Sequence, residues 1–250
     1  RAQVTTSRLF VDAPLAAGQT LALPESTARH AQVLRLQPGH MLVLFDGRGG
    51  EWRAEVASMG RREVSVRVHA HVNVSREAAV EVTIALGMPA NERMDTLVEK
   101  ATELGVATVQ PLCTARSVLR LQGERAERRR AHWQAVAVAA AEQSGRTCVP
   151  AIAPVRSLAD WLETLPASSP ADDEDAARWL LSPAADAPRW APAAPSCARA
   201  IVLSGPEGGL DAGEEARARA CGFVSVGLGP RVLRADTAPL VVLAALSLWR

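Results

Sequence analysis

The chain has 250 residues, of which 48% are hydrophobic and 22% are charged, a composition typical of one large globular domain or two smaller ones. No apolar run approaches the roughly 18 residues that a membrane-spanning helix needs, so we expect no membrane partner. The net charge of +1 does not by itself indicate a nucleic-acid partner, although the ten arginines and seven acidic residues of residues 1–77 leave a basic excess at that end.

The first part of the chain predicts a small β-barrel of roughly 70 residues. Short alternating runs rich in Val and Leu predict strands within residues 20–24, 40–47, 51–60 and 62–72. The sequence DGRGG at residues 46–50 predicts a turn between two of them. Residues 25–35 predict one helix, with Ser26 or Thr27 as its N-cap.

Near residues 75–79 the pattern changes to strands that alternate with helices, which is typical of an α/β fold with a doubly wound parallel sheet. Residues 92–105 predict a helix, because apolar side chains recur at helical spacing at Met94, Leu97, Val98, Ala101 and Leu104. Gly105 is its predicted C-cap. The other predicted helices are residues 124–145, residues 211–222 and a closing helix within 230–249. The predicted strands are residues 80–88, 106–113, 178–182, 199–204 and 223–229.

Two glycine-containing loops stand between a predicted strand and a predicted helix, the usual ligand position in an open α/β sheet. They are LSGPEGGL at residues 203–210 and GLGPRVLR at residues 227–234. Together they predict an apolar slot lined by backbone polar groups, which suits a flat adenine ring. Neither matches GxGxxG or GxxxxGK[ST], so a Rossmann or P-loop site is not expected. The first loop taken alone is also compatible with a plain structural turn.

Seven motifs in one register, distributed over nearly the whole chain, together resemble the ribosomal RNA small subunit methyltransferase E family, whose members are S-adenosylmethionine (SAM) enzymes of the SPOUT class. The motifs are RLFVD, HAQVLRLQPGHMLVLFDGRG, ERMDTLVEKATELGVATVQPL, ARSV, HWQAVAVAAAEQSGR, LSGPEGGL and VGLGPRVLRADTA. The third contains Lys100, the only lysine of the chain, which has a surface pair with Glu103 as its alternative explanation.

The resemblance implies a PUA-like, RNA-binding β-barrel at residues 1–74 and a SPOUT methyltransferase domain at residues 78–250. The second domain would be an α/β fold whose parallel sheet carries a deep C-terminal trefoil knot. The resemblance further implies SAM as the methyl donor, a homodimer formed through the SPOUT domain, and methylation of uridine N3 in 16S ribosomal RNA. The substrate would be that RNA or the assembled small ribosomal subunit, in the cytoplasm. No metal is expected, since His69 and His71 have no third ligand near them in the sequence.

The resemblance also implies site residues. One wall of the donor site would be Leu203, Gly205, Pro206, Glu207 and Gly208, and the other would be Leu228, Gly229, Val232, Leu233 and Arg234. The residues matching family positions that could contact RNA phosphates are Arg8, His30, Arg35, Arg93 and Arg116, with a solvated surface charge as the alternative for each arginine.

The base that takes the N3 proton is not identified by the sequence, and Asp236 and Arg234 are the candidates. The family more often has Glu at the position of Asp236, and capping of the last helix is its alternative role. Glu207 has the alternative of holding its loop by accepting hydrogen bonds from backbone N–H groups. Two other functions stay open for the chain: a SPOUT methyltransferase acting on transfer RNA or large-subunit RNA, and a non-catalytic RNA-binding protein of ribosome assembly.

Overall fold

The computed structural model describes residues 6–61, 63–90, 93–166, 176–184, 187–191 and 197–248. The chain divides into two compact units, one of Arg1–Glu77 with Ala141–Val149 and one of Ala78–Ala140 with Pro150–Arg250. The sequence predicted domains of residues 1–74 and 78–250. The structure differs by joining residues 141–149 to the first unit.

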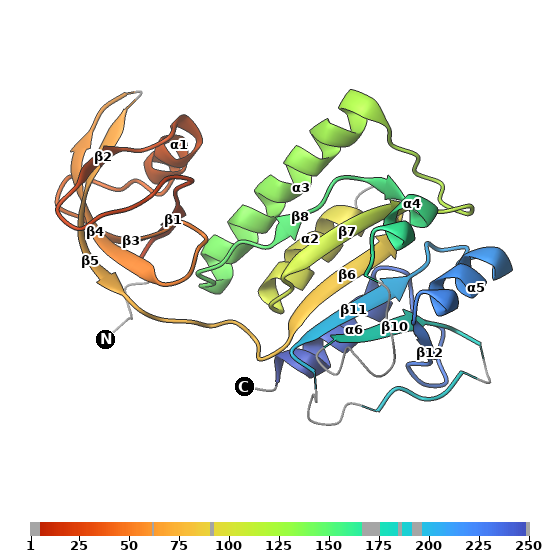
Figure 1. The fold of residues 1–250 in the computed structure, drawn as a ribbon. Helices are drawn as coiled ribbons and strands as arrows, with labels where there is room; N and C mark the ends of the chain where they lie inside the picture. The colour runs from red at the N-terminus through yellow and green to blue at the C-terminus, as the bar shows by residue number, and fades with distance from the viewer. Residues whose placement is uncertain are drawn as a thin grey trace. The chain divides into compact units, whose positions relative to one another are not determined.

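The first unit is built on a five-stranded sheet in the order β1-β3-β4-β5-β2 (Figure 1). Its strands are β1 (Arg8–Phe10), β2 (Thr20–Ala22), β3 (Met41–Phe45), β4 (Glu51–Met59) and β5 (Val64–Val72). All pairs are antiparallel except β1 with β3, and two register shifts between β4 and β5 bend the sheet around its apolar core. The four predicted strands are confirmed, whereas β1 is too short to show a pattern of its own.

Helix α1 (Glu25–Val33) confirms the predicted helix, but the predicted N-caps are wrong. Pro24 occupies the N-cap position and no side chain caps the helix. Thr27 is buried, and its hydroxyl donates to the carbonyl oxygen of Phe10 at 3.1 Å. The hydroxyl is therefore used to attach the helix to strand β1.

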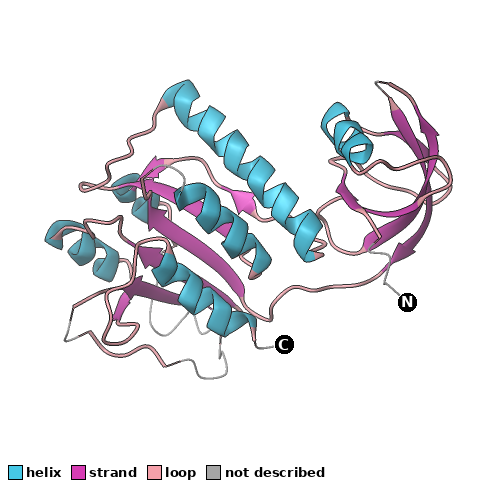
Figure 2. Ribbon diagram, turned by 180° about the vertical axis from the view of Figure 1, so that it is seen from behind, coloured by secondary structure: helices cyan, strands magenta, loops and turns pink. Residues whose placement is uncertain are grey.

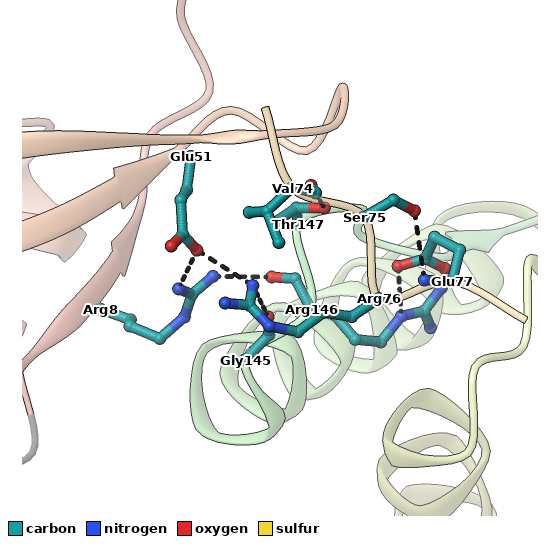
Figure 3. Close-up of polar contacts among 9 residues, drawn as sticks. All are labelled: Arg8, Glu51, Val74, Ser75, Arg76, Glu77, Gly145, Arg146 and Thr147. Carbon is teal, nitrogen blue, oxygen red and sulfur yellow. Dashed lines mark hydrogen bonds and ion pairs between the residues drawn. The ribbon is translucent and has the colours of Figure 1, made fainter. Parts of the chain in front are cut away.

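A cluster of ion pairs explains why residues 141–149 belong to the first unit (Figure 3). Glu51 accepts hydrogen bonds from both Arg8 and Arg76, and Arg76 also donates to the carbonyl oxygen of Gly145 at 2.9 Å. Arg146 pairs with Glu77. Burial opposes the charge of Glu51, but hydrogen bonds from Arg76 and Arg8 outweigh it and hold the pKa of this carboxyl below its ordinary value.

The second unit is built on a seven-stranded parallel sheet in the order β12-β10-β11-β6-β7-β8, with β9 pairing beside β7. The strands are β6 (Glu81–Gly87), β7 (Thr108–Cys113), β8 (Ala151–Ile152), β9 (Arg156–Ser157), β10 (Ala176–Leu181), β11 (Arg199–Ser204) and β12 (Val224–Val226). The helices are α2 (Arg93–Glu103), α3 (Gly123–Ser144), α4 (Leu158–Glu163), α5 (Ala212–Ala220) and α6 (Thr237–Ser247). This parallel sheet confirms the predicted α/β class, while the knot stays a prediction.

Helices cover both faces of the parallel sheet. On one face, α4 and α5 contact each other (Figure 1), and their apolar side chains pack on alternate strand residues such as Ala85, Leu112 and Leu203. On the opposite face, seen in Figure 2, α6 contacts both α2 and β11. The helix-ending role predicted for Gly105 is confirmed by its φ of +93°. Strands β8 and β9 and helix α4 were not predicted because each is too short to show a period.

We expect Glu51→Gln to lower the free energy of unfolding at pH 7 by about 2 kcal/mol, since it leaves two arginines without their carboxylate. Because the folded-state pKa of Glu51 lies below 4.5, ionisation stabilises the fold above that pH and the effect is lost as pH falls through the folded-state pKa. Urea unfolding of both proteins from pH 7 to pH 3 measures the difference.

Glu55→Gln is the matched control, because Glu55 pairs with His69 at 3.4 Å and its side chain is 40% exposed. This variant should change the free energy of unfolding by roughly 0.5 kcal/mol or less. An equal loss of unfolding free energy in the two variants would contradict a special contribution of Glu51 and its two arginines to stability.

Candidate functional site

A cavity of about 550 Å³ lies at the carboxyl ends of strands β10 and β11 in the second unit. Both glycine-containing loops border it. The loop after β11 contributes Gly205, Pro206, Glu207, Gly208, Gly209 and Leu210, and the loop after β12 contributes Leu228, Gly229, Arg231, Val232, Leu233 and Arg234. The structure thus brings together two segments whose predicted association rested on their sequence pattern and the family resemblance.

A third wall, which sequence reasoning missed, comes from the end of β10. Leu180, Leu181, Ser182 and Pro183 line the cavity beside the two loops. Strand β10 pairs with both β11 and β12, so its carboxyl end lies between theirs. The strand itself was predicted from the sequence RWLLS, but only the strand order shows that its end meets the two loops.

The first loop turns back on itself in very little space. A Cβ atom on Gly205 would lie 2.7 Å from the backbone of both Gly209 and Leu210. One on Gly87, at the end of the neighbouring strand β6, would lie 2.4 Å from Pro206 Cδ and 2.7 Å from its nitrogen. Gly87 was not predicted as a site residue, yet its missing side chain is what lets the loop approach β6.

The second loop is shaped by conformation and exposure. Gly229 has a φ of +108°, which strains any residue with a side chain. Val232 borders the cavity but is 85% exposed. Leu203, predicted as part of the first wall, is fully buried in the core of the sheet and does not line the cavity. Its side chain supports the site from within the core.

Side chains from two other segments hold the first loop in place. Glu207 accepts hydrogen bonds from the backbone N–H of Ala90 at 3.1 Å and from Arg93 at 3.3 Å. Arg116 donates to the carbonyl oxygens of Gly208 at 2.8 Å and Leu210 at 3.3 Å. The alternative role of Glu207, acceptance of backbone hydrogen bonds, is therefore present in the structure. Arg93 and Arg116 border the cavity while they bind the loop.

Glu214 completes this support and was also missed. This buried carboxylate accepts from the backbone N–H groups of Ala115 at 2.7 Å and Asp211 at 3.0 Å, and the Asp211 side chain accepts in turn from Glu214 N. The result is a capping box at the start of α5 that also fixes the segment after β7. The pattern D-x-x-E at residues 211–214 is the sequence signal that could have revealed it.

The two catalytic candidates differ in their surroundings. Arg234 is exposed and borders the cavity. Asp236 is not among the lining residues, and it makes no side-chain cap for α6 although it occupies the N-cap position. Its Oδ1 atom is buried without a hydrogen-bond partner among the described residues. The predicted capping role of Asp236 is thus wrong, and this carboxylate is left without an evident structural use.

The remaining RNA candidates belong to the first unit. Arg8 is 14% exposed in its side chain and is bound by Glu51 and by the carbonyl oxygen of Arg146 (Figure 3). Its guanidinium lies 5.2 Å from the centre of the Phe45 ring. These contacts argue for a structural role and against phosphate binding. His30 lies 3.2 Å from Glu142 and its side chain is 41% exposed. Arg35 is exposed, with a φ of +54°.

Other features of the described residues bear on the chemistry. No group of three or more His, Cys, Asp or Glu side chains among them lies close enough to hold a metal ion. None of the helices within the described ranges is long and apolar enough to cross a membrane. The surface pair predicted for Lys100 is confirmed, since its ammonium lies 2.8 Å from Glu103 and 2.6 Å from Glu99, and the hydrogen bonds that it donates to these two carboxylates raise its pKa.

Comparison with known proteins gives consistent matches. A family model described as an RNA methyltransferase domain matches residues 76–247, and one described as an RNA methyltransferase PUA domain matches residues 23–68. Ribosomal RNA small subunit methyltransferase E of Bacillus subtilis is 33% identical over 225 residues, covering 86% of this chain and 84% of the relative. The protein of the same name from Mycobacterium bovis is 34% identical over 215 residues, covering 86% and 80%.

A solved structure agrees. The crystal structure of a ribosomal RNA small subunit methyltransferase E from Neisseria gonorrhoeae, bound to S-adenosyl methionine, superposes with a TM-score of 0.87 and 31% sequence identity, covering 98% of each chain. The predicted family resemblance and the predicted PUA-like unit before an α/β domain are thereby confirmed.

We expect Arg116→Ala to loosen the first glycine-containing loop, because it removes the donor that binds the carbonyl oxygens of Gly208 and Leu210. Hydrogen exchange of the peptide spanning residues 205–211 should become faster by roughly five- to tenfold, which corresponds to the loss of about 1 kcal/mol. Arg128→Ala is the control, since Arg128 is 78% exposed in its side chain and should leave that exchange unchanged. Equal exchange rates in the Arg116 variant and the unsubstituted protein would show that the hydrogen bonds of Arg116 do not stabilise the loop.

Proposed function

The chain belongs to the RNA methyltransferase family, and we propose that it transfers a methyl group from SAM to N3 of a specific uridine in 16S ribosomal RNA. The observation that carries the proposal is the three-walled cavity at the carboxyl edge of the parallel sheet, in a chain that matches the SAM-bound relative along almost its whole length. Ligands of open α/β sheets bind at this edge.

The residues of the cavity fit SAM. Leu180, Leu228 and Leu233 offer apolar surface for an adenine ring, and the backbone of the glycine-containing loops offers N–H and C=O groups to its polar edge. When bound, SAM supplies a methyl group already activated on a sulfonium. The protein's task is therefore to hold the acceptor nitrogen in line with that group and to exclude water.

Methylation at uridine N3 requires two further steps from the protein. Uridine N3 lies on the Watson–Crick edge, so the base must be unpaired or extruded, and its proton must leave. We assign Arg234, exposed at the cavity, to a uridine carbonyl oxygen, where a guanidinium stabilises the negative charge that develops as the proton leaves. Asp236 is proposed as the acceptor of that proton, because its Oδ1 has no partner among the described residues and its chain neighbours Ala235 and Ala238 line the cavity. The proposal includes a rotation of the Asp236 side chain toward the cavity when RNA binds, since a general base must come within hydrogen-bond reach of the proton.

RNA contacts are proposed for the exposed basic side chains. Arg35 and His30 in the first unit and Arg93 and Arg116 beside the cavity stay in the proposed set, and Arg8 is removed from it. Arg93 and Arg116 already bind the loop, so their contribution to RNA binding includes holding the site in shape. The partner is 16S ribosomal RNA or the assembled small subunit.

A homodimer formed through the second unit is also proposed. Val232 at the cavity is 85% exposed and Val241 of α6 is 39% exposed, and covering these side chains with a second copy would remove apolar surface from water. Sedimentation or light scattering of the full chain tests this state, and a monomer at micromolar concentration would contradict it.

The function is tested by methyl transfer from labelled SAM to purified small subunits, large subunits and transfer RNA from a strain that lacks this gene, with modified nucleosides identified by mass spectrometry. We expect N3-methyluridine in the small subunit only. Label in another RNA would replace the target while keeping the enzyme. No label anywhere, with SAM still bound, would favour the non-catalytic RNA-binding protein.

We expect Asp236→Asn to lower kcat at least 100-fold while the Kd for SAM stays within a factor of two, because a general base contributes about 10²–10⁴-fold and its amide cannot take the proton. Asp236→Glu, which keeps the carboxylate, should retain most of the activity. Steady-state assays on small subunits give kcat, and titration calorimetry gives the Kd. Equal activity of Asp236→Asn and the unsubstituted enzyme would remove Asp236 from the mechanism.

A further inference from the structure

A second cavity of about 330 Å³ lies in the second unit, near the carboxyl ends of β7 and β9 and beside the paired helices α4 and α5. The proposed methyl transfer does not use it. Its polar side chains include Arg120 and Gln122 from the segment before α3 and Arg217 from α5, and its apolar side chains include Leu158 and Leu162 from α4.

The charges of this cavity favour an anion. Arg217 is exposed and forms no ion pair with a described residue, and among the described residues Arg120 donates only to the carbonyl oxygen of Ala115, at 3.3 Å. Glu214 is the one carboxylate among the described lining residues, and both of its oxygens already accept backbone N–H groups, from Ala115 and Asp211. Two guanidinium groups are therefore available to phosphate oxygens without a competing carboxylate.

The rest of the lining suits a nucleobase. Leu158 and Leu162 are buried and give an apolar wall against which a base can lie. The exposed Gln122 side chain makes no hydrogen bond to a described residue and carries both a donor and an acceptor for a base edge. A small cavity that joins an apolar wall, an amide and two arginines matches one nucleotide of single-stranded RNA.

The two cavities are neighbours along one short segment. Ala115 lines the second cavity and Arg116, the next residue, lines the first. Glu214 ties Ala115 to Asp211, which directly follows the first glycine-containing loop. We propose that the second cavity binds a nucleotide flanking the methylated uridine, through Arg120, Arg217 and Gln122. This inference rests on the proposed function and names a further binding site for its RNA substrate.

The experiment compares the full-length Arg120→Ala/Arg217→Ala variant with the unsubstituted protein in methyl transfer to small subunits. We expect KM for the subunit to rise about tenfold, with kcat and the Kd for SAM changed less than twofold, because the lost contacts position the substrate. The slope of log KM against log salt concentration should also fall by about 0.7 for each phosphate contact removed.

Two further variants sharpen the test. Ala159→Trp fills the second cavity from α4 without changing charge and should raise KM to a similar extent. Arg128→Ala removes an exposed arginine of the same unit that borders neither cavity, and it should leave KM unchanged.

The outcomes separate this inference from the function on which it rests. A KM unchanged by both cavity variants, in an enzyme that methylates small subunits, would overturn the second site and leave the proposed function intact. A protein that methylates no RNA would overturn the proposed function instead, and direct binding of a uridine-containing oligonucleotide would then test the cavity. Unaltered oligonucleotide affinity in both variants would overturn the inference in that case.

Discussion

The arrangement of the site in the second unit depends on the close approach of the first glycine-containing loop to strand β6. Pro206 lies so near Gly87 that a side chain on the glycine would meet its ring at 2.4 Å, and the loop folds on itself just as tightly at Gly205. Because glycines form much of this loop, few side chains fill the space at the carboxyl edge of the sheet. That space stays open as the cavity, which Leu210 and the segments after β10 and β12 enclose.

A glycine-rich loop has few side chains that can pack against one another, so contacts with other segments must fix its conformation. Glu207 of the loop accepts from the backbone N–H of Ala90, Arg116 donates to the carbonyl oxygen of Gly208, and Glu214 accepts from the backbone N–H of Ala115. The first contact joins the loop to the segment after β6, and the other two join the loop and the start of α5 to the segment after β7. Glu207 and Arg116, which the sequence predicted as ligand-binding residues, therefore also hold the first glycine-containing loop in one arrangement.

The sequence predicted most of the regular elements and both glycine-containing loops, because helical spacing, alternation and glycine position are local signals. It did not predict the wall from β10, since only the strand order places that strand between β11 and β12. It also misjudged Arg8. An arginine that matches a family position carries no local sign that Glu51, 43 residues away, will bind it. These two failures are non-local pairings. The wrong N-caps of α1 and α6 and the missed short elements β8, β9 and α4 are local failures, because a capping residue type does not ensure a capping hydrogen bond and a very short segment shows no period.

Arg8 and Arg120 show how the same residue type divides between structural support and substrate binding. In the first unit, Glu51 lies between Arg8 and Arg76, so its charge offsets one of these two positive charges inside the protein. Arg120 and Arg217 have no carboxylate partner among the described residues, and Arg231 and Arg234 stand exposed at the main cavity. Uncompensated positive charge is thus concentrated along the edge where both cavities open. A chain with a net charge of only +1 can attract a polyanion to that edge, because attraction at short range depends on where unpaired charges lie more than on their sum.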